Sequence, residues 1–297
     1  MGSGEWGKDA IPHSPLPIPY SPLPALFMIT LLTDFGLSDY FVAAVKGVIL
    51  TISPGTQIVD ITHNVAAQDL QSAAFILGAC YQNFPVGTIH VAVVDPGVGS
   101  SRRAIVAGAG GHFFVGPDNG IFSFVYARET DVRVFHLTRD RYFRNPVSQT
   151  FHGRDVFAPV AAHLARSLKP EEIGEEIGDY VRFEIPRPRL VEPQGVIEGR
   201  IIHIDHFGNC VTNFTEADLK PDGIMPSTRF YFGGREIRQF GTFFAGAMNR
   251  ADLFAYPGSA GFWEIALWCG SAAKFINARC GDEITLDCGL RIADCGL

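Results

Sequence analysis

The sequence predicts an α/β protein that carries a second, smaller all-β domain, and three observations support this. In the first half, short apolar segments alternate with amphipathic ones, as in a mostly parallel central sheet with helices. In the second half, short strands follow one another without a long helical period, as in a barrel. Residues 180–193 contain Pro186 and Pro188 and predict the boundary. We therefore expect an N-terminal α/β domain at 26–188 and a C-terminal, barrel-like β domain at 189–297.

The composition predicts a soluble globular protein. The chain of 297 residues can form two domains with separate cores, and it has 47% hydrophobic residues, 19% charged residues and a net charge of -7. This mild acidity, without a basic cluster, argues against a nucleic-acid partner, because phosphates require concentrated Lys and Arg. No apolar run reaches the roughly 18 residues that span a bilayer, so we also expect no membrane partner.

Neither the cysteines nor the N-terminal segment points to secretion. The cysteines form no C-x-x-C pair and fit no zinc template, so we expect reduced thiols in a cytoplasmic protein. Residues 1–25 are rich in Gly, Ser and Pro and lack the basic start and apolar core of a secretory signal. We interpret them as a disordered tail or a start-site artefact. The cysteines are Cys80, Cys210, Cys269, Cys280, Cys288 and Cys295.

The first strand and helix predict a βα unit with an acidic turn between them. Residues 27–32 indicate a buried strand, and residues 39–51 indicate a helix with Ser38 as its N-cap. The turn is Thr33-Asp34-Phe35-Gly36. At this edge of the sheet Asp34 either forms the turn or accepts two hydrogen bonds from a ribose diol.

Further elements complete the first domain. Strands at 57–62 and 88–94 flank a helix that Asp69 caps and that runs to about residue 83, with right-handed crossovers. Residues 104–116 predict an antiparallel hairpin around Gly110-Gly111, and residues 132–137 predict another strand. Asp118 and Asn119 lie in a predicted turn, where a turn-forming role is favoured over a ligand contact.

Two stretches supply candidate catalytic side chains. Asp95 follows a buried strand, at the edge where open α/β sheets bind ligands, and the Pro and Gly residues after it let Arg102 fold back. The alternative is a purely structural Asp95–Arg102 pair. His152 lies just before a helix that Asp155 is expected to cap, and its imidazole can donate a hydrogen bond or act as a base.

The second domain has a polar interruption that predicts ligand recognition. Asp205 and Asn209 lie at a strand end, where they either recognise a polar ligand edge or form a turn. Residues 256–261 form a second loop of the same domain. The strands are expected at 195–204, 227–232, 235–240, 262–267 and 283–286.

Six motifs in this order closely resemble the S-adenosyl-L-methionine hydroxide adenosyltransferase family, which also includes the fluorinase and chlorinase. The resemblance runs from about Ile29 to about Leu286. The motifs are Thr33-Asp34-Phe35-Gly36, Val59-Asp-Ile-Thr-His63, Val94-Asp-Pro-Gly-Val-Gly99 with Arg102-Arg103, Val115-Gly-Pro-Asp-Asn-Gly120, Phe151-His-Gly-Arg-Asp155 and Asp205-His-Phe-Gly-Asn209.

The resemblance implies a homotrimer with ligand sites between the N-terminal domain of one subunit and the C-terminal domain of the next. It also implies attack of water on C5′ of S-adenosyl-L-methionine, which releases adenosine and L-methionine. Asp95, Arg102 and His152 would hold and activate the water, with either Asp95 or His152 as the base. A sulfonium leaves as a neutral thioether, so positioning and a base suffice, without a cofactor or metal.

The resemblance also assigns substrate contacts. Asp34 matches the ribose-diol acceptor, Asn209 the adenine partner and Asp205 the carboxylate that faces the methionine ammonium. Ser259 matches a residue near the methionine carboxylate, and Phe207 belongs to the same set.

Some positions depart from relatives in that family. Ala260 stands where halogenating members have Arg, and Trp268-Cys269 stands near the adenine where other members often have Asn. Those halogenating members carry Tyr at the position of Asp95, and a carboxylate there would repel a halide and bind water instead. We therefore predict hydrolysis without a halide.

Two other interpretations remain open. One is a metal-dependent hydrolase, in which a carboxylate-histidine cluster holds the ion, although the spacing matches no tight metal motif. The other is a non-catalytic sensor of adenosine or adenosylmethionine. The cluster of the first interpretation would comprise Asp34, Asp60, His63, Asp69, Asp95 and His152.

Overall fold

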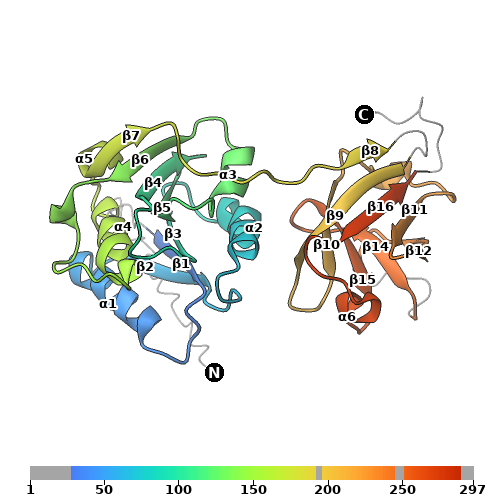
Figure 1. Ribbon diagram of the computed structural model, residues 1–297, viewed down its shortest axis with the longest axis horizontal. Coiled ribbons are helices and arrows are strands. Elements are labelled where there is room, and N and C mark those ends of the chain that lie inside the picture. The colour runs from blue at the N-terminus through green and yellow to red at the C-terminus, as the bar shows by residue number, and fades with distance from the viewer. Residues whose placement is uncertain (1–27, 192–195, 245–250, 289–297) are drawn as a thin grey trace, which may run out of the picture.

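The computed structural model of the chain describes residues 28–191, 196–244 and 251–288, and it has two lobes. A seven-stranded sheet with its helices forms the N-lobe, and a nine-stranded sheet forms the C-lobe (Figure 1). The predicted fold class is confirmed. We retain the proposed domain boundary at residues 188 and 189, between β7 and β8. The predictions for residues 1–25 and for Cys295 lie outside the described residues.

The N-lobe sheet is parallel in one half and antiparallel in the other. Its order is β2-β1-β3-β5-β4-β6-β7, and β2, β1, β3 and β5 run parallel to one another. The strands are β1 Met28–Thr33, β2 Gln57–Thr62, β3 Ile89–Val93, β4 Ala104–Ala109, β5 His112–Pro117, β6 Arg133–Leu137 and β7 Gly174–Ile177. The predicted hairpin is confirmed as β4–β5, and its turn residues Gly110 and Gly111 have φ angles of 57° and 76°.

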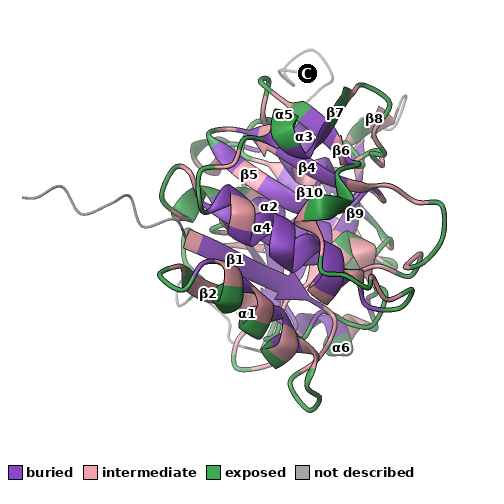
Figure 2. Ribbon diagram, turned by 90° about the vertical axis from the view of Figure 1, so that its left-hand side faces the viewer, coloured by how far each residue is buried: buried purple, intermediate pink, exposed green. Residues whose placement is uncertain are grey.

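Helices lie on both faces of this sheet (Figure 1), which buries β1 and β3 almost completely, and Figure 2 shows β1 as a mostly buried strand. Residues of α1 and α4 belong to one core cluster with Ile29 and Val91, whereas those of α2 and α3 belong to a second cluster with Leu32 and Ala92. The helices are α1 Phe41–Ile52, α2 Leu70–Cys80, η1 Tyr81–Asn83, α3 Ser123–Arg128, η2 Asp140–Tyr142, the π-helix η3 Gly153–Phe157, α4 Ala158–Leu164 and α5 Pro170–Ile173. None of the helices in the described ranges has the length and apolarity to cross a bilayer.

Two predicted helix caps are wrong, and one is confirmed. Asp69 caps α2 by accepting from Ser72 N at 3.0 Å. Ser38 does not cap α1, which begins at Phe41 because Phe41 and its neighbour Tyr40 pack against Phe151.

Asp155 is not an N-cap either, because it lies inside η3 and is fully buried. Its carboxylate accepts from Arg154 and Arg144 and from the backbone N–H of Ser148 at 2.9 Å. These donors replace water, so a helix-interior carboxylate is tolerated. His152 itself occupies the capping position of η3.

The C-lobe sheet curls into a barrel-like shape (Figure 1). Its order is β12-β11-β16-β9-β10-β15-β14-β13, with β8 also paired to β9. The sequence interpretation missed β8, β10, β14 and the short α6, and it merged β12 with β13. The elements are β8 Arg189–Val191, β9 Val196–Ile204, β10 Cys210–Thr215, η4 Pro221–Gly223, β11 Arg229–Phe232, β12 Arg235–Ile237, β13 Gln239–Phe240, β14 Leu253–Pro257, β15 Phe262–Leu267, α6 Ala272–Ile276 and β16 Glu283–Asp287.

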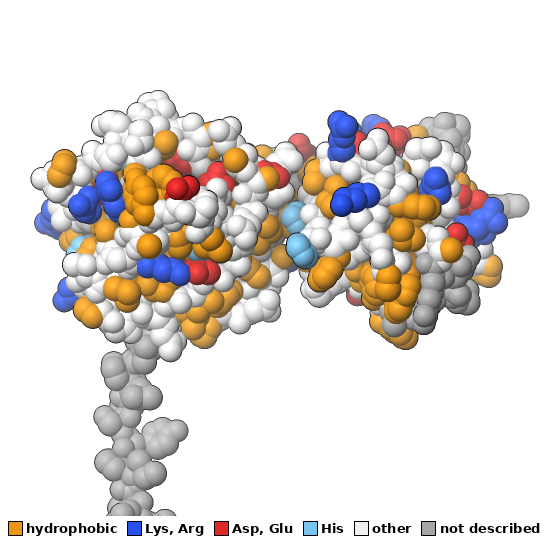
Figure 3. Space-filling model, turned by 90° about the horizontal axis from the view of Figure 1, so that it is seen from below, with side chains coloured by type: hydrophobic (Ala, Val, Ile, Leu, Met, Phe, Trp, Pro, Cys, Tyr) orange, Lys and Arg blue, Asp and Glu red, His pale blue; other side chains and the backbone are white. Residues whose placement is uncertain are grey.

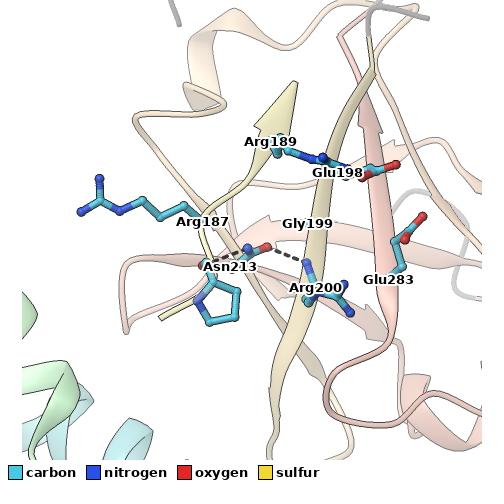
Figure 4. Close-up of a pocket in the computed structure, with 8 residues that line it drawn as sticks. Arg187, Arg189, Glu198, Gly199, Arg200, Asn213 and Glu283 are labelled. Carbon is cyan, nitrogen blue, oxygen red and sulfur yellow. Dashed lines mark hydrogen bonds and ion pairs between the residues drawn. The ribbon is translucent and has the colours of Figure 1, made fainter. Parts of the chain in front are cut away.

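The lobes are connected by an extended segment and meet at a small contact. Phe75 of α2 stacks on His203 of β9 with ring centroids 4.6 Å apart, and Figure 3 shows histidine side chains at the border of the lobes. The connecting segment is held at Pro186, whose carbonyl accepts from Asn213 Nδ2 at 3.0 Å. A pocket of about 190 Å³ beside it is lined by Arg187, Glu198 and other C-lobe residues (Figure 4). It contains none of the predicted site residues.

Candidate active site

Asp95 lies at the carboxyl end of a buried strand, as predicted. The preceding Val94 is fully buried, and its carbonyl accepts from Asn119 Nδ2 at 2.8 Å. Asp118 pairs with Arg103, whose Nε lies 2.8 Å from its Oδ2. Asn119 and Asp118 therefore support the turn and the strand end in this structure.

Arg102 folds back onto Asp95, as the sequence predicted. Its Nε lies 2.9 Å from Oδ1 and 3.0 Å from Oδ2, and Nη2 also contacts Oδ2. The two side chains are 11% and 5% exposed, so little solvent screens the pair. Gly99 makes the fold-back possible, because its φ is 79° and a Cβ there would lie 2.4 Å from Gln149 O.

His152 completes this cluster of three side chains. Its Nδ1 lies 2.8 Å from Arg102 Nη2. Because a guanidinium can only donate, Nδ1 is the acceptor, and the neutral ring carries its proton on Nε2. Burial and the Arg102 guanidinium lower the pKa of His152, which the Asp95 and Asp155 carboxylates only partly oppose. The imidazole is therefore neutral at neutral pH.

Asp34 lies at the same edge of the N-lobe sheet. One carboxylate oxygen, Oδ2, accepts from Gln68 N at 2.9 Å. The neighbouring Phe35 ring packs on Phe151, with ring centroids 5.9 Å apart. Gly153 leaves room for Phe35, because a Cβ at position 153 would lie only 3.2 Å from the Phe35 ring. This aromatic contact links the Asp34 turn to the segment that carries His152. We call Asp34, Asp95, Arg102 and His152 the N-terminal half-site.

Asp205 and Asn209 close a tight turn between β9 and β10. Asn209 donates from its backbone N–H to Asp205 Oδ1 at 2.8 Å and from Nδ2 to Oδ2 at 2.9 Å. The Asn209 side-chain oxygen is buried and has no hydrogen-bond partner among the described residues. A buried acceptor without a donor is unfavourable, so this oxygen is a candidate ligand contact. Phe207, at the tip of the turn, is 74% exposed.

Glu264 is a candidate site residue that the sequence interpretation missed. It lies in β15, is 9% exposed and accepts from the Tyr256 hydroxyl. Burial raises the pKa of Glu264 and the nearby Asp205 carboxylate adds to this, whereas the bond from Tyr256 works in the opposite direction. The sequence contained an indication of this residue, because Glu264 is the only charged residue in the apolar run Phe-Trp-Glu-Ile-Ala-Leu at 262–267.

The loop that carries Ser259 lies over Glu264. Gly258 is in such close contact that a Cβ there would lie 2.0 Å from Glu264 Oε1, and the exposed Ser259 follows it. Within the described residues no Lys, Arg or His forms an ion pair with Asp205 or Glu264. We call Asp205, Phe207, Asn209, Ser259 and Glu264 the C-terminal half-site.

The two half-sites belong to different lobes (Figure 1), and no hydrogen bond or ion pair among the described residues joins them. The six residues of the metal alternative do not gather either. Asp60 pairs with Lys46 at 2.6 Å, and His63 contacts Thr33 at 2.8 Å. The described ranges contain no group of three His, Cys, Asp or Glu side chains arranged to hold a metal ion.

Comparisons with known proteins match most of the chain. The model of the SAM hydroxide adenosyltransferase N-terminal domain matches residues 29–174, and that of the C-terminal domain matches residues 199–285. An (R)-S-adenosyl-L-methionine hydrolase from Thermus thermophilus is 38% identical, covering 86% of this chain and 97% of that protein. One from Methanocaldococcus jannaschii is 33% identical over 88% of this chain and 96% of that protein.

A more distant relative and a solved structure extend this similarity. A fluorinase from Actinoplanes sp. is 28% identical, covering 87% of this chain and 97% of that protein. The crystal structure of an uncharacterized conserved protein from Thermotoga maritima superposes with a TM-score of 0.80 at 35% identity, covering 87% of this chain and 99% of that one.

Proposed function

Because this chain belongs to the SAM hydroxide adenosyltransferase family, we propose that it hydrolyses S-adenosyl-L-methionine to adenosine and L-methionine. The observation that carries the proposal is the contact of Arg102 with both Asp95 and His152 at the end of β3. These groups can bind a single water from two sides, with an acceptor on one and an N–H donor on the other. The residue roles below are part of this proposal.

In the proposed reaction a water oxygen forms a bond to C5′ while the C5′–S bond breaks. The electron pair of the broken bond stays on sulfur, which leaves as the neutral thioether of methionine. The water proton passes to a base and then to solvent. Neither a general acid nor a cofactor takes part, and the protein contributes position and proton transfer.

Asp95 is the base in this mechanism. Because His152 Nδ1 is already an acceptor for Arg102, the neutral ring presents only Nε2–H, which can hold the water oxygen but cannot take its proton. Arg102 holds the Asp95 carboxylate in place. A carboxylate suffices as base, because the attacking water becomes strongly acidic as its bond to carbon forms. The anionic Asp95 also disfavours a halide as nucleophile.

The substrate contacts follow from the unsatisfied groups. Asp34 accepts from the ribose diol, and the buried Asn209 oxygen accepts from the adenine amino group. Asp205 and Glu264 together bind the methionine ammonium, a cation that neither acquires from the described chain.

Ser259 and the backbone of its loop bind the methionine carboxylate, since Ala260 offers no cation. Phe207 contacts the nucleoside from the exposed tip of its turn. Trp268 stacks on Phe244 at 5.4 Å, so the strand end that carries Trp268 contributes an aromatic surface rather than an amide to the adenine end of the site.

We propose that the protein is a cytoplasmic homotrimer in which each site forms between subunits. The family resemblance is the basis for the trimer, and the separation of the two half-sites within one chain supports sites between subunits. Co-expression of Asp95→Asn with Asp205→Asn, which disable different half-sites, tests this. Mixed oligomers would regain activity because some interfaces combine two intact half-sites. Activity no greater than that of the separate variants, in a verified mixed oligomer, would contradict sites between subunits.

The experiment that tests the function is turnover of S-adenosyl-L-methionine in H₂¹⁸O. We expect one ¹⁸O in the 5′-hydroxyl of the released adenosine, detected by mass spectrometry. Turnover without label in adenosine would exclude attack of water at C5′. A sensor would bind adenosine without turnover, so absence of any adenosine release from the intact protein would favour that alternative.

A further inference from the structure

The turn that carries Asp34 is tied on both sides to one buried histidine. Thr33 ends β1 and His63 follows β2, and they are 2% and 3% exposed. The Thr33 hydroxyl lies 2.8 Å from His63 Nδ1 and accepts from Phe35 N at 3.2 Å. The His63 carbonyl accepts from Gly36 N at 2.8 Å. Residues before and after Asp34 are thus held by His63.

These contacts between Thr33 and His63 follow an irregularity in the pairing of β1 with β2. The register of β1 and β2 shifts at Leu31, which lies opposite Asp60, whereas Leu32 lies opposite Thr62. Beyond this irregularity no backbone ladder extends along the turn. The bonds of the Thr33 hydroxyl and the backbone bond from Gly36 N to the His63 carbonyl therefore hold the turn.

An ion pair at the surface fixes the orientation of the imidazole. Asp60 Oδ1 lies 3.1 Å from His63 Nε2, although these atoms make no hydrogen bond of good geometry, and Lys46 Nζ lies 2.6 Å from Asp60 Oδ2. Burial tends to raise the pKa of Asp60, but the nearby Lys46 and His63 side chains lower it overall. The anion favours a proton on Nε2, so Nδ1 remains an acceptor for the Thr33 hydroxyl.

We infer that His63, acting through Thr33, is a positioning residue that orients the Asp34 carboxylate toward the ribose of the substrate. The inference rests on the proposed function, in which Asp34 binds the ribose diol. Gln68 N already occupies Oδ2 of Asp34, and Oδ1 has no hydrogen-bond partner among the described residues. A change in the turn would move the free oxygen and weaken ribose binding. The contacts that hold the water site, from Arg102 to Asp95 and to His152, include neither Thr33 nor His63, so kcat should change less than ribose binding.

The same strand supplies a matched control. Thr30 lies three residues before Thr33 in β1, is fully buried and contacts His90 Nδ1 at the same distance of 2.8 Å. It lies in the middle of the strand, away from the Asp34 turn. Thr30→Val and Thr33→Val thus remove the same kind of buried Thr–His bond, and only the second affects the turn.

The test measures adenosine binding by calorimetry and S-adenosyl-L-methionine turnover for both variants, with folding checked by circular dichroism. For Thr33→Val we expect the adenosine Kd and the KM to rise about three- to tenfold, the effect of one lost hydrogen bond, with kcat within about twofold. Thr30→Val should change none of them beyond about twofold. Thr33→Ser, which keeps the hydroxyl, should restore binding.

The readout specific to Asp34 uses 2′,3′-dideoxyadenosine, which lacks the diol. Its affinity should be the same for the intact protein and for Thr33→Val, and Thr33→Val should add nothing to Asp34→Asn. An equal loss for both nucleosides, or additive losses in the double variant, would show a merely structural role and overturn the inference, as would failure of the intact protein to bind adenosine. Diol-dependent coupling without turnover would support the inference and contradict the proposed hydrolysis instead.

Discussion

The two half-sites differ in how their charges are balanced within the chain. In the N-terminal half-site, Asp95 is paired with Arg102, which is also bound to His152, so the charge of this carboxylate is balanced within the lobe. Asp205 and Glu264 have no cation among the described residues, and burial together with Asp205 raises the pKa of Glu264. In the proposed mechanism, Asp95 must stay in place and is paired with a cation of the protein. Asp205 and Glu264 would bind a cation of the ligand and have no protein cation beside them in the described ranges.

The largest expected effect separates chemistry from binding in the N-terminal half-site. Asp95→Asn removes the proton acceptor, so kcat should fall about 10²- to 10⁴-fold while adenosine affinity stays within about twofold. Chromatography of released adenosine and calorimetry measure the two quantities. The control is Asp118→Asn, which disrupts the neighbouring Arg103–Asp118 pair and should lower stability more than kcat. Equal losses of kcat in both variants would mean that Asp95 is only structural.

A smaller effect is expected when the C-terminal half-site loses one of its carboxylates. Glu264→Gln keeps the bond from Tyr256 possible but removes the charge, so KM for S-adenosyl-L-methionine should rise about tenfold or more. Adenosine, which has no ammonium, should bind as before. Glu236→Gln, a change in another C-lobe strand whose acid pairs with Arg229, serves as the control. A parallel loss of adenosine affinity would show that Glu264 acts through the fold.

The pH dependence should distinguish the two half-sites, because His152 of the N-terminal half-site affects kcat and Glu264 of the C-terminal half-site affects KM. The pKa of His152 is lowered from its usual value of 6.5, so the ring is still mostly neutral at pH 6.5. Therefore kcat should fall only below that pH. Because the pKa of Glu264 is raised, its charge is lost on acidification already above its usual value of 4.5, which should raise KM. Initial rates across pH measure both. Glu264→Gln should abolish this rise in KM but keep the fall in kcat, and an unchanged KM profile would contradict the assignment.

The smallest expected effect is that of a chelator. The carboxylates and histidines of the described residues form no metal-binding group, and the proposed chemistry needs none. Dialysis against EDTA should leave kcat and KM unchanged within error. A loss of activity that Mg²⁺ or Zn²⁺ restores would revive the metal-dependent alternative and contradict the proposed mechanism.

The sequence predicted strands β1 to β6, helices α1, α2 and α4 and part of the candidate site, because these depend on local patterns, but it missed α3, α5 and β7. Arg102 is only seven residues from Asp95, and the glycines between them allow a fold-back that is visible in the sequence. His152 is 50 residues from Arg102, so only the family resemblance suggested that they meet. Local sequence patterns alone thus did not reveal this contact between two distant segments.

The errors arise where tertiary contacts override local preference. Ser38 and Asp155 are typical capping residues, but aromatic packing at Phe41 moved one helix start, and the Arg144 and Arg154 guanidiniums stabilise Asp155 inside a helix. Strand β10 was missed because its buried Thr212 and Asn213 look like loop residues. Their polar atoms are satisfied by Trp263 O, Pro186 O and Arg200 N, which the sequence does not reveal.

The extended segment between β7 and β8 has a consequence for how such proteins diversify. In the proposed mechanism this segment separates the lobe whose cluster positions the water from the lobe that binds the amino acid part of the substrate, so either lobe can accumulate mutations without altering the other. A replacement at the end of β3 can then change the incoming nucleophile while the same sulfonium compound is still bound. New chemistry can thus arise in descendants of one gene without an intermediate that has lost its substrate.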